Sequence, residues 1–166
     1  MVEVMIVFVV LTVAMALFTS TVASTSRQRL AKRESVLAAE AGRRMLEVLR
    51  NEEFVGLFAR YNASAADDPP LVTSPGPHFE VTGLTPADGD ADGCVGEIVF
   101  PAPGPVLRED AVDPPLGLPR DLDGDDTIDA EDHASDYVVL PILVRLSWKS
   151  QAGTRTLEMY TLLADQ

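Results

Sequence analysis

The side chains best suited to chemistry in this chain are the carboxylates between Asp121 and Asp132. The segment reads DLDGDDTIDAED, so acids occupy its first, third, fifth, ninth and twelfth positions. Calcium takes six to eight hard oxygen ligands, and alternate acids on a tightly turned loop supply such oxygens. The spacing therefore predicts a calcium site. The alternative is an acidic loop that only water solvates.

This segment resembles the twelve-residue calcium loop of EF-hands and dockerins. The resemblance implies side-chain ligands from Asp121, Asp123 and Asp125 and a main-chain carbonyl ligand from Thr127. It also implies a water-mediated contact from Asp129 and a closing carboxylate from Asp132. Asp126 stands in the sixth position, where Gly is usual, although Asp tolerates a positive φ better than most residues. Pro114, Pro115 and Pro119 preclude a normal entering helix. We therefore expect a calcium loop without the helix–loop–helix frame.

A second acidic stretch repeats the beginning of this pattern. Asp88, Asp90 and Asp92 alternate, and Gly93 occupies the expected sixth position. The twelfth position is Val99, so a closing carboxylate is missing unless Glu97 replaces it. This stretch is a possible second metal loop, and a turn between two strands explains the same residues.

Charge and cysteine content exclude several classes of function. The net charge is −13, which argues against a nucleic-acid partner. Residues 61–136 hold eighteen acids and only two bases, so bound cations would relieve strong repulsion there. The single cysteine, Cys94, excludes an intramolecular disulfide and any multi-cysteine metal site. His78 and His133 have no triad or zinc pattern around them, so we expect no enzyme, and we predict His133 at the surface.

The distribution of proline along the chain indicates which secondary-structure elements flank these loops. All twelve prolines lie between Pro69 and Pro141, which leaves the first 68 residues free of helix breakers. Apolar residues recur at helical spacing through this region, so one long helix is expected from about Val2 to Tyr61. We divide it into a transmembrane or filament-core segment, 1–25, and an amphipathic continuation, 26–61. A small β-rich head follows over 62–166.

Within the head, residues 62–136 are predicted as acidic loops and 137–163 as a C-terminal hairpin. Alternating apolar residues from Tyr137 to Trp148, a turn ending at Gly153 and renewed alternation to Leu163 predict two paired strands. Shorter strands are expected at 78–82 and 96–100. The fold class is therefore α+β, with a long N-terminal helix packed on a small antiparallel sheet.

The apolar run from Val4 to Phe18 lengthens to about twenty residues when the small residues to Ala23 are counted, which suits a membrane span. A secretory signal peptide cleaved after Ala23 is the alternative, although Glu3 stands where such a peptide carries bases. The four bases between Arg27 and Arg33 would keep the C-terminal part cytoplasmic by the positive-inside rule, unless a basic leader precedes this sequence.

The stretch Val2-Glu3-Val4-Met5-Ile6, followed by an apolar run and a long amphipathic helix, resembles the N-terminus of type IV pilins and type II secretion pseudopilins. Met1 stands where Leu is usual, and the upstream leader, Gly and Phe-Thr pair of the family are absent. We therefore expect that Met1 is internal and that a leader precedes it. The resemblance implies that Glu3 helps subunits enter a filament by neutralising a neighbour's N-terminal amine. Hydration of Glu3 among lipid headgroups is the alternative.

The expected function is a structural subunit, a minor pilin or pseudopilin, with a calcium-stabilised head. The resemblance implies insertion in a bacterial inner membrane, with the head outside the cytoplasm, and later assembly into a periplasmic or extracellular filament. Implied partners are other pilin or pseudopilin subunits, the membrane before assembly and a prepilin peptidase if a leader exists. The alternative function is a secreted or surface-anchored calcium-dependent binding module with a cleaved signal peptide.

Overall fold

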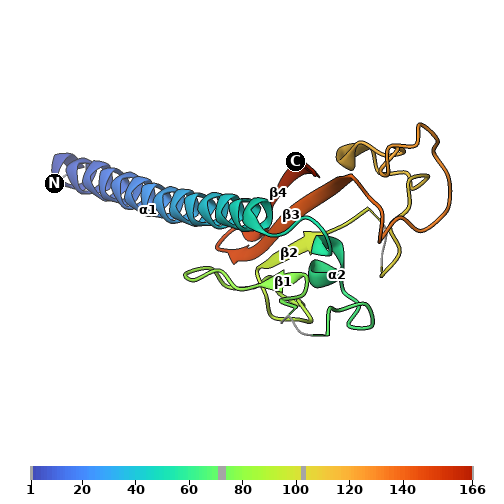
Figure 1. The fold of residues 1–166 in the computed structure, drawn as a ribbon. Coiled ribbons are helices and arrows are strands. Elements are labelled where there is room, and N and C mark those ends of the chain that lie inside the picture. The colour runs from blue at the N-terminus through green and yellow to red at the C-terminus, as the bar shows by residue number, and fades with distance from the viewer. Residues whose placement is uncertain (1, 71–73, 102–103, 166) are drawn as a thin grey trace.

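The computed structural model describes residues 2–70, 74–101 and 104–165, so Met1 of the pilin-like motif lies outside the described residues. The described chain forms a long helix, α1 (Val2–Asn51), and a four-stranded antiparallel sheet surrounded by loops (Figure 1). This arrangement confirms the predicted α+β class, with the helix at the N-terminus and a hairpin at the C-terminus.

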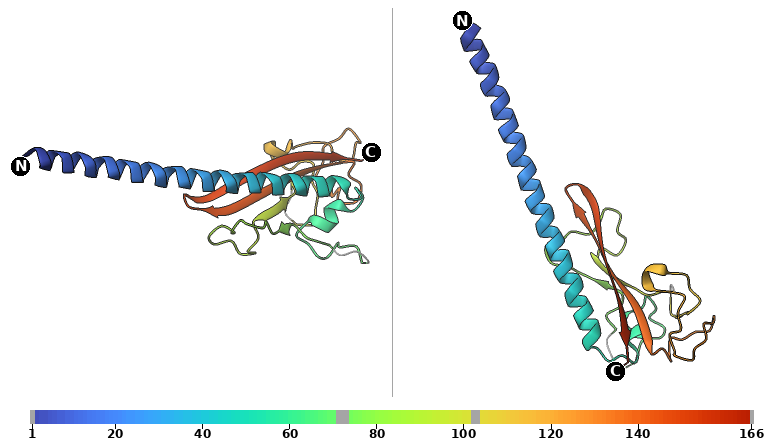
Figure 2. Two further views of the ribbon diagram at one scale, coloured as in Figure 1. Left: turned by 90° about the vertical axis from the view of Figure 1, so that its left-hand side faces the viewer. Right: turned by 90° about the horizontal axis from the view of Figure 1, so that it is seen from above.

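Helix α1 runs without a break for 50 residues. Its first half projects beyond the head and touches no other element (Figure 2), and its apolar side chains from Val2 to Val22 are exposed. The length and apolar composition of this end suffice to cross a membrane, and none of its most apolar window is buried. By length and composition, this segment is a candidate membrane span.

The helix ends at Asn51, so the prediction of one helix to Tyr61 is wrong. Gly56 adopts a left-handed conformation with φ of 78°, and a short helix, α2 (Leu57–Tyr61), follows it. The turn brings Phe58 into the core, where it is fully buried. Arg60 closes the turn through an ion pair of 2.7 Å with Glu52. Helix propensity alone permits continuation here, and burial of the aromatic side chain overrides it.

The sheet has the strand order β1-β2-β3-β4, and all of its neighbours are antiparallel. β1 (His78–Phe79) and β2 (Gly96–Val99) are shorter than the predicted strands, since β1 pairs with β2 at two positions and β2 pairs with β3 at four. β3 (Val139–Ser150) and β4 (Gly153–Ala164) form the predicted hairpin. A two-residue turn, Gln151 and Ala152, joins them, and the first residue of β4, Gly153, has a φ of 111° that is accessible mainly to glycine.

The hairpin holds α1 through one face of β3. Leu140, Ile142, Val144 and Leu146 alternate along that face and are fully buried, as the period of two in a strand requires. Gly42 is the contact point on α1, because a Cβ there would lie only 2.8 Å from Sδ of Met159 on β4. The glycine thus permits close packing of the helix on the sheet.

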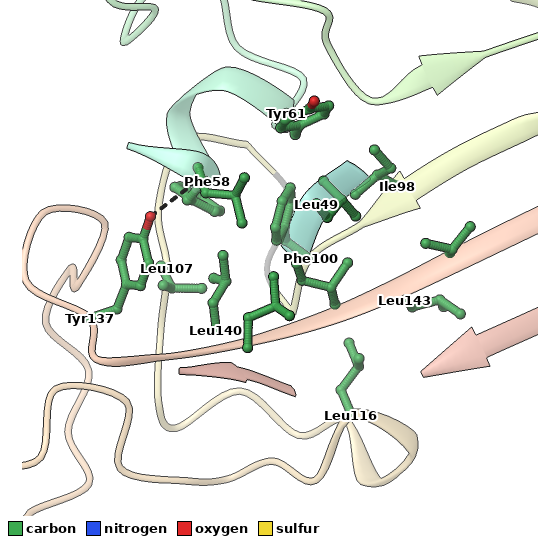
Figure 3. Packing of buried hydrophobic residues seen from close by; sticks show 14 of the residues in the cluster. Leu49, Phe58, Tyr61, Ile98, Phe100, Leu107, Leu116, Tyr137, Leu140 and Leu143 are labelled. Atoms are coloured by element: carbon green, nitrogen blue, oxygen red, sulfur yellow. Dashed lines mark hydrogen bonds between the residues drawn. The ribbon is translucent and has the colours of Figure 1, made fainter. Parts of the chain in front are cut away.

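Aromatic rings join α2 to the loops beyond the sheet. Phe58 and Phe100 pack edge to face with ring centroids 5.0 Å apart. The hydroxyl of Tyr137 donates to the carbonyl of Phe54 at 2.8 Å and accepts from the amide of Phe58 at 3.2 Å (Figure 3). Leu107 packs in the same cluster, so the turn after α1 and the acidic loop region share one core.

Gly96→Ala is expected to destabilise the head by about 1–3 kcal/mol, because the new Cβ would collide with the ring of Phe79, its partner on β1. Unfolding of the full chain in detergent micelles, followed by the fluorescence of the single, buried Trp148, measures the loss. In a Phe79→Ala background the same change should have a much smaller effect. An equal effect in both backgrounds would contradict this explanation.

Candidate metal centre

The acidic loop is attached firmly to the core. Leu122, its second residue, is fully buried, and its carbonyl accepts hydrogen bonds from the amides of Val138 at 2.7 Å and Val139 at 3.0 Å. At the other end, the amide of His133 donates to the carbonyl of Leu107 at 2.9 Å. The loop between these anchors therefore has a fixed position beside β3.

Within the loop, carboxylates organise the backbone. Asp121 accepts hydrogen bonds from the amides of Gly124 at 2.6 Å and Asp126 at 2.9 Å. Asp123 accepts one from the amide of Asp125 at 3.1 Å. Asp126 has φ of 68°, so the sixth position adopts the left-handed conformation that Gly usually supplies in calcium loops. The local turn is therefore the one that the sequence pattern predicts.

Three of the predicted ligands lie together in this turn. Asp121, Asp123 and Asp125 each present a carboxylate oxygen within 4.8 Å of the other two. The backbone hydrogen bond from Gly124 is the largest influence on Asp121 and holds the pKa of that carboxyl below its usual value. A group of carboxylate oxygens at such spacing matches the preference of calcium for hard oxygen ligands, and nothing in it identifies calcium specifically.

The other predicted carboxylate ligands, Asp129 and Asp132, do not belong to the close groups of ligand side chains found among the described residues, and the carbonyl of Thr127 is not tested by those groups. Asp129 places Oδ1 3.2 Å from Nε2 of His133. Asp132 accepts a hydrogen bond from the amide of Leu107 at 3.0 Å and so ties the end of the loop to the core. Their role as metal ligands stays a prediction.

Sequence reasoning missed Glu109, which lies under the loop. Its side chain is only 1% exposed. Oε1 accepts hydrogen bonds from the amides of Leu122 at 2.5 Å and Asp123 at 3.3 Å, and Oε2 accepts from Asp129 at 3.3 Å. Glu109 precedes the loop by twelve residues and belongs to no spacing pattern, so no local signal could have identified it.

His133 is buried, with 5% exposure, so the prediction of a surface histidine is wrong. EF-hand loops are followed by an apolar residue, and that preference was itself the signal for an inward-facing position. Burial lowers the pKa of His133. The hydrogen bond with Asp129 and the charges of Glu109, Asp136 and Asp123 together outweigh burial, so the pKa is raised above its ordinary value.

The second acidic stretch is arranged differently. Asp88 pairs with Nζ of Lys149 at 2.6 Å, and Asp92 pairs with Nδ1 of His78 at 2.8 Å. Glu97 lies on β2, 3.3 Å from Arg145. Among the described residues, these acids form no close group with Asp90, and three of them pair with separate basic side chains. Metal binding by this stretch stays a prediction.

Glu3, the predicted assembly residue, lies in the first turn of α1 with an exposed side chain. It is far along the free half of the helix from the acidic loops (Figure 2). The two predicted functional regions therefore occupy opposite ends of the molecule.

Comparison with protein-family models, curated proteins and solved structures gives no significant match.

Proposed function

We propose that this chain is a structural subunit of a type IV pilus-like or type II secretion filament, a minor pilin or pseudopilin without catalytic activity. One observation carries the proposal. Helix α1 continues unbroken from an exposed apolar half into a half that is packed on the sheet. Such a half-exposed apolar helix requires a hydrocarbon or helical partner outside its own chain.

A membrane is one such partner and a bundle of equivalent helices is the other. The proposed sequence of events is insertion in a bacterial inner membrane with the head outside the cytoplasm, followed by transfer of α1 into a filament core. Other pilin or pseudopilin subunits would surround the helix there. A prepilin peptidase would act first if a leader lies upstream.

Glu3 is the proposed assembly residue, because a carboxylate in an apolar bundle is stable only when it is paired or protonated. Its exposed position in the first turn of α1 leaves it available to the N-terminal amine of a neighbouring subunit.

Glu3→Leu should therefore reduce the fraction of the chain that enters sheared filaments by about tenfold or more, since even one pairing of about 1.4 kcal/mol corresponds to a factor of ten. The fraction is measured by immunoblot of filament and membrane fractions from the native host. Glu47→Leu, an exposed acid in the packed half of α1, is the matched control and should assemble normally. Normal incorporation of the Glu3 variant would count against the assembly role.

N-terminal sequencing of the mature chain separates this function from the alternative, a secreted calcium-dependent binding module. A mature chain that retains the apolar half of α1 supports a filament subunit. A chain that begins just after Ala23 supports a cleaved signal peptide.

We also propose that the head is stabilised by calcium at the acidic loop, with Asp121, Asp123 and Asp125 as the central ligands. Their converging oxygens and the left-handed Asp126 support this assignment. Bound calcium would offset the repulsion among the acids of the head.

A further inference from the structure

A second group of metal-ligating side chains lies on the buried side of the acidic loop. Glu109, Asp123 and His133 each offer one ligand atom within 4.8 Å of the others. Nε2 of His133 lies 3.9 Å from Oε2 of Glu109, and Nδ1 lies 3.5 Å from Oδ2 of Asp123. The group differs from the three-aspartate group because it contains a nitrogen donor and is largely buried.

The two nitrogens of His133 have different surroundings. Nε2 is within hydrogen-bonding distance of Oδ1 of Asp129, at 3.2 Å. Nδ1 is buried and has no hydrogen-bond partner among the described residues. Oxygens of Asp123 and Asp136 lie 3.5 Å and 3.4 Å from it, outside hydrogen-bonding geometry. A buried polar atom normally has a hydrogen-bond partner, whereas Nδ1 faces two carboxylates and makes a hydrogen bond with neither.

This asymmetry is the usual arrangement of a metal-bound histidine. One ring nitrogen donates to a carboxylate, which fixes the ring, and the other nitrogen binds the metal. Here Asp129 would orient the ring and leave Nδ1 as the ligand. In a tetrahedral site with bonds of about 2.0–2.1 Å, ligand atoms are about 3.3 Å apart. The distances from Nδ1 to Asp123 and Asp136 are close to that value.

The neighbouring carboxylates retain free capacity for a metal. Glu109 uses Oε1 for two backbone hydrogen bonds, whereas Oε2 accepts only a long bond of 3.3 Å from Asp129. Asp123 accepts its backbone hydrogen bond through Oδ1, so Oδ2 faces His133. One oxygen of each side chain is therefore available.

We propose that Nδ1 of His133, Asp123 and Asp136 bind a divalent transition-metal ion of the zinc class, with Glu109 as a further carboxylate on the buried side. Imidazole nitrogen combined with carboxylate suits Zn²⁺, whereas calcium takes oxygen ligands alone. The site is therefore separate from the calcium loop and shares only the Asp123 side chain with it. The assignment does not depend on the proposed filament function.

Titration of the full chain in detergent micelles with Zn²⁺ tests this proposal, using calorimetry at saturating calcium. We expect one Zn²⁺ per chain, and His133→Gln should weaken binding by at least about tenfold. His78→Gln is the matched control, because His78 is the only other histidine and pairs with Asp92 at the surface. It should leave the affinity unchanged. Equal binding by both variants, or no Zn²⁺ binding by the unmodified chain, would overturn the site.

A second measurement does not require the variant to fold. Co²⁺ replaces Zn²⁺ in such sites and broadens the NMR signals of nearby protons. In the unmodified chain, Co²⁺ should broaden the ring signals of His133 at one equivalent and spare those of His78. Equal broadening of the signals of both histidines, or of neither, would show that the ion does not bind specifically beside His133.

Discussion

Phe58→Ala lowers the free energy of unfolding of the head by about 3–5 kcal/mol, on our expectation, because it removes a fully buried ring. That ring is the edge-to-face partner of Phe100 and lies beside Tyr137, so the cavity would open where α2, the sheet and the loops meet. The loss is large against the 5–15 kcal/mol that typically separates folded from unfolded domains.

Chemical unfolding of the full chain in micelles, followed by Trp148 fluorescence, measures this change. Val55→Ala is the matched control, three residues away in the same turn, where the side chain is 73% exposed. It should alter stability by less than about 0.5 kcal/mol. If the two variants lost equal stability, the central place of Phe58 in the core would be refuted.

Calcium should raise the melting temperature of the head by about 5–10 °C. An ion present at about a hundred times its Kd stabilises the folded state by about 2.7 kcal/mol, and each kcal/mol corresponds to about 2–4 °C for a chain of this size. Thermal melting in millimolar calcium and in chelator, with the same fluorescence signal, gives the difference. Magnesium at the same concentration should have a much smaller effect, because it requires a tighter octahedral site.

Asp121→Asn should abolish most of the calcium-dependent shift, because Asp121 presents one of the three converging oxygens. Asp88→Asn, in the second acidic stretch, should retain the shift, since Asp88 is paired with Lys149. The reverse pattern would assign calcium to the second stretch. Identical melting curves with and without calcium would remove the proposed role of the ion.

The elements whose order depends on local pattern could be predicted from the sequence. Alternating apolar residues from Tyr137 onward predicted the hairpin, and the proline-free apolar start predicted the long helix. The end of that helix could not be predicted, because residues 52–61 are compatible with helix. The burial of Phe58 beside Tyr137, 79 positions away in the sequence, is a tertiary contact that the local pattern does not show.

The candidate site likewise has one part that could be predicted from the sequence and one part that could not. Asp121, Asp123 and Asp125 are close in sequence, and a single tight turn brings their oxygens together. Glu109 and His133 lie 24 positions apart and meet only because both are packed beneath the folded loop. Pairing at that separation depends on tertiary structure, which a spacing pattern does not encode.

Helix α1 is continuous from its free half to its packed half, and this continuity has a mechanical consequence. The helix lies lengthwise along the β3–β4 hairpin (Figure 2). Tension on its N-terminal end therefore reaches the sheet as shear spread over the whole interface, from Ala38 to Leu49, rather than as peeling of one contact at a time. An interface loaded in shear resists force far better than one loaded by peeling. The head would thus stay packed on α1 under loads that exceed the strength of any single contact.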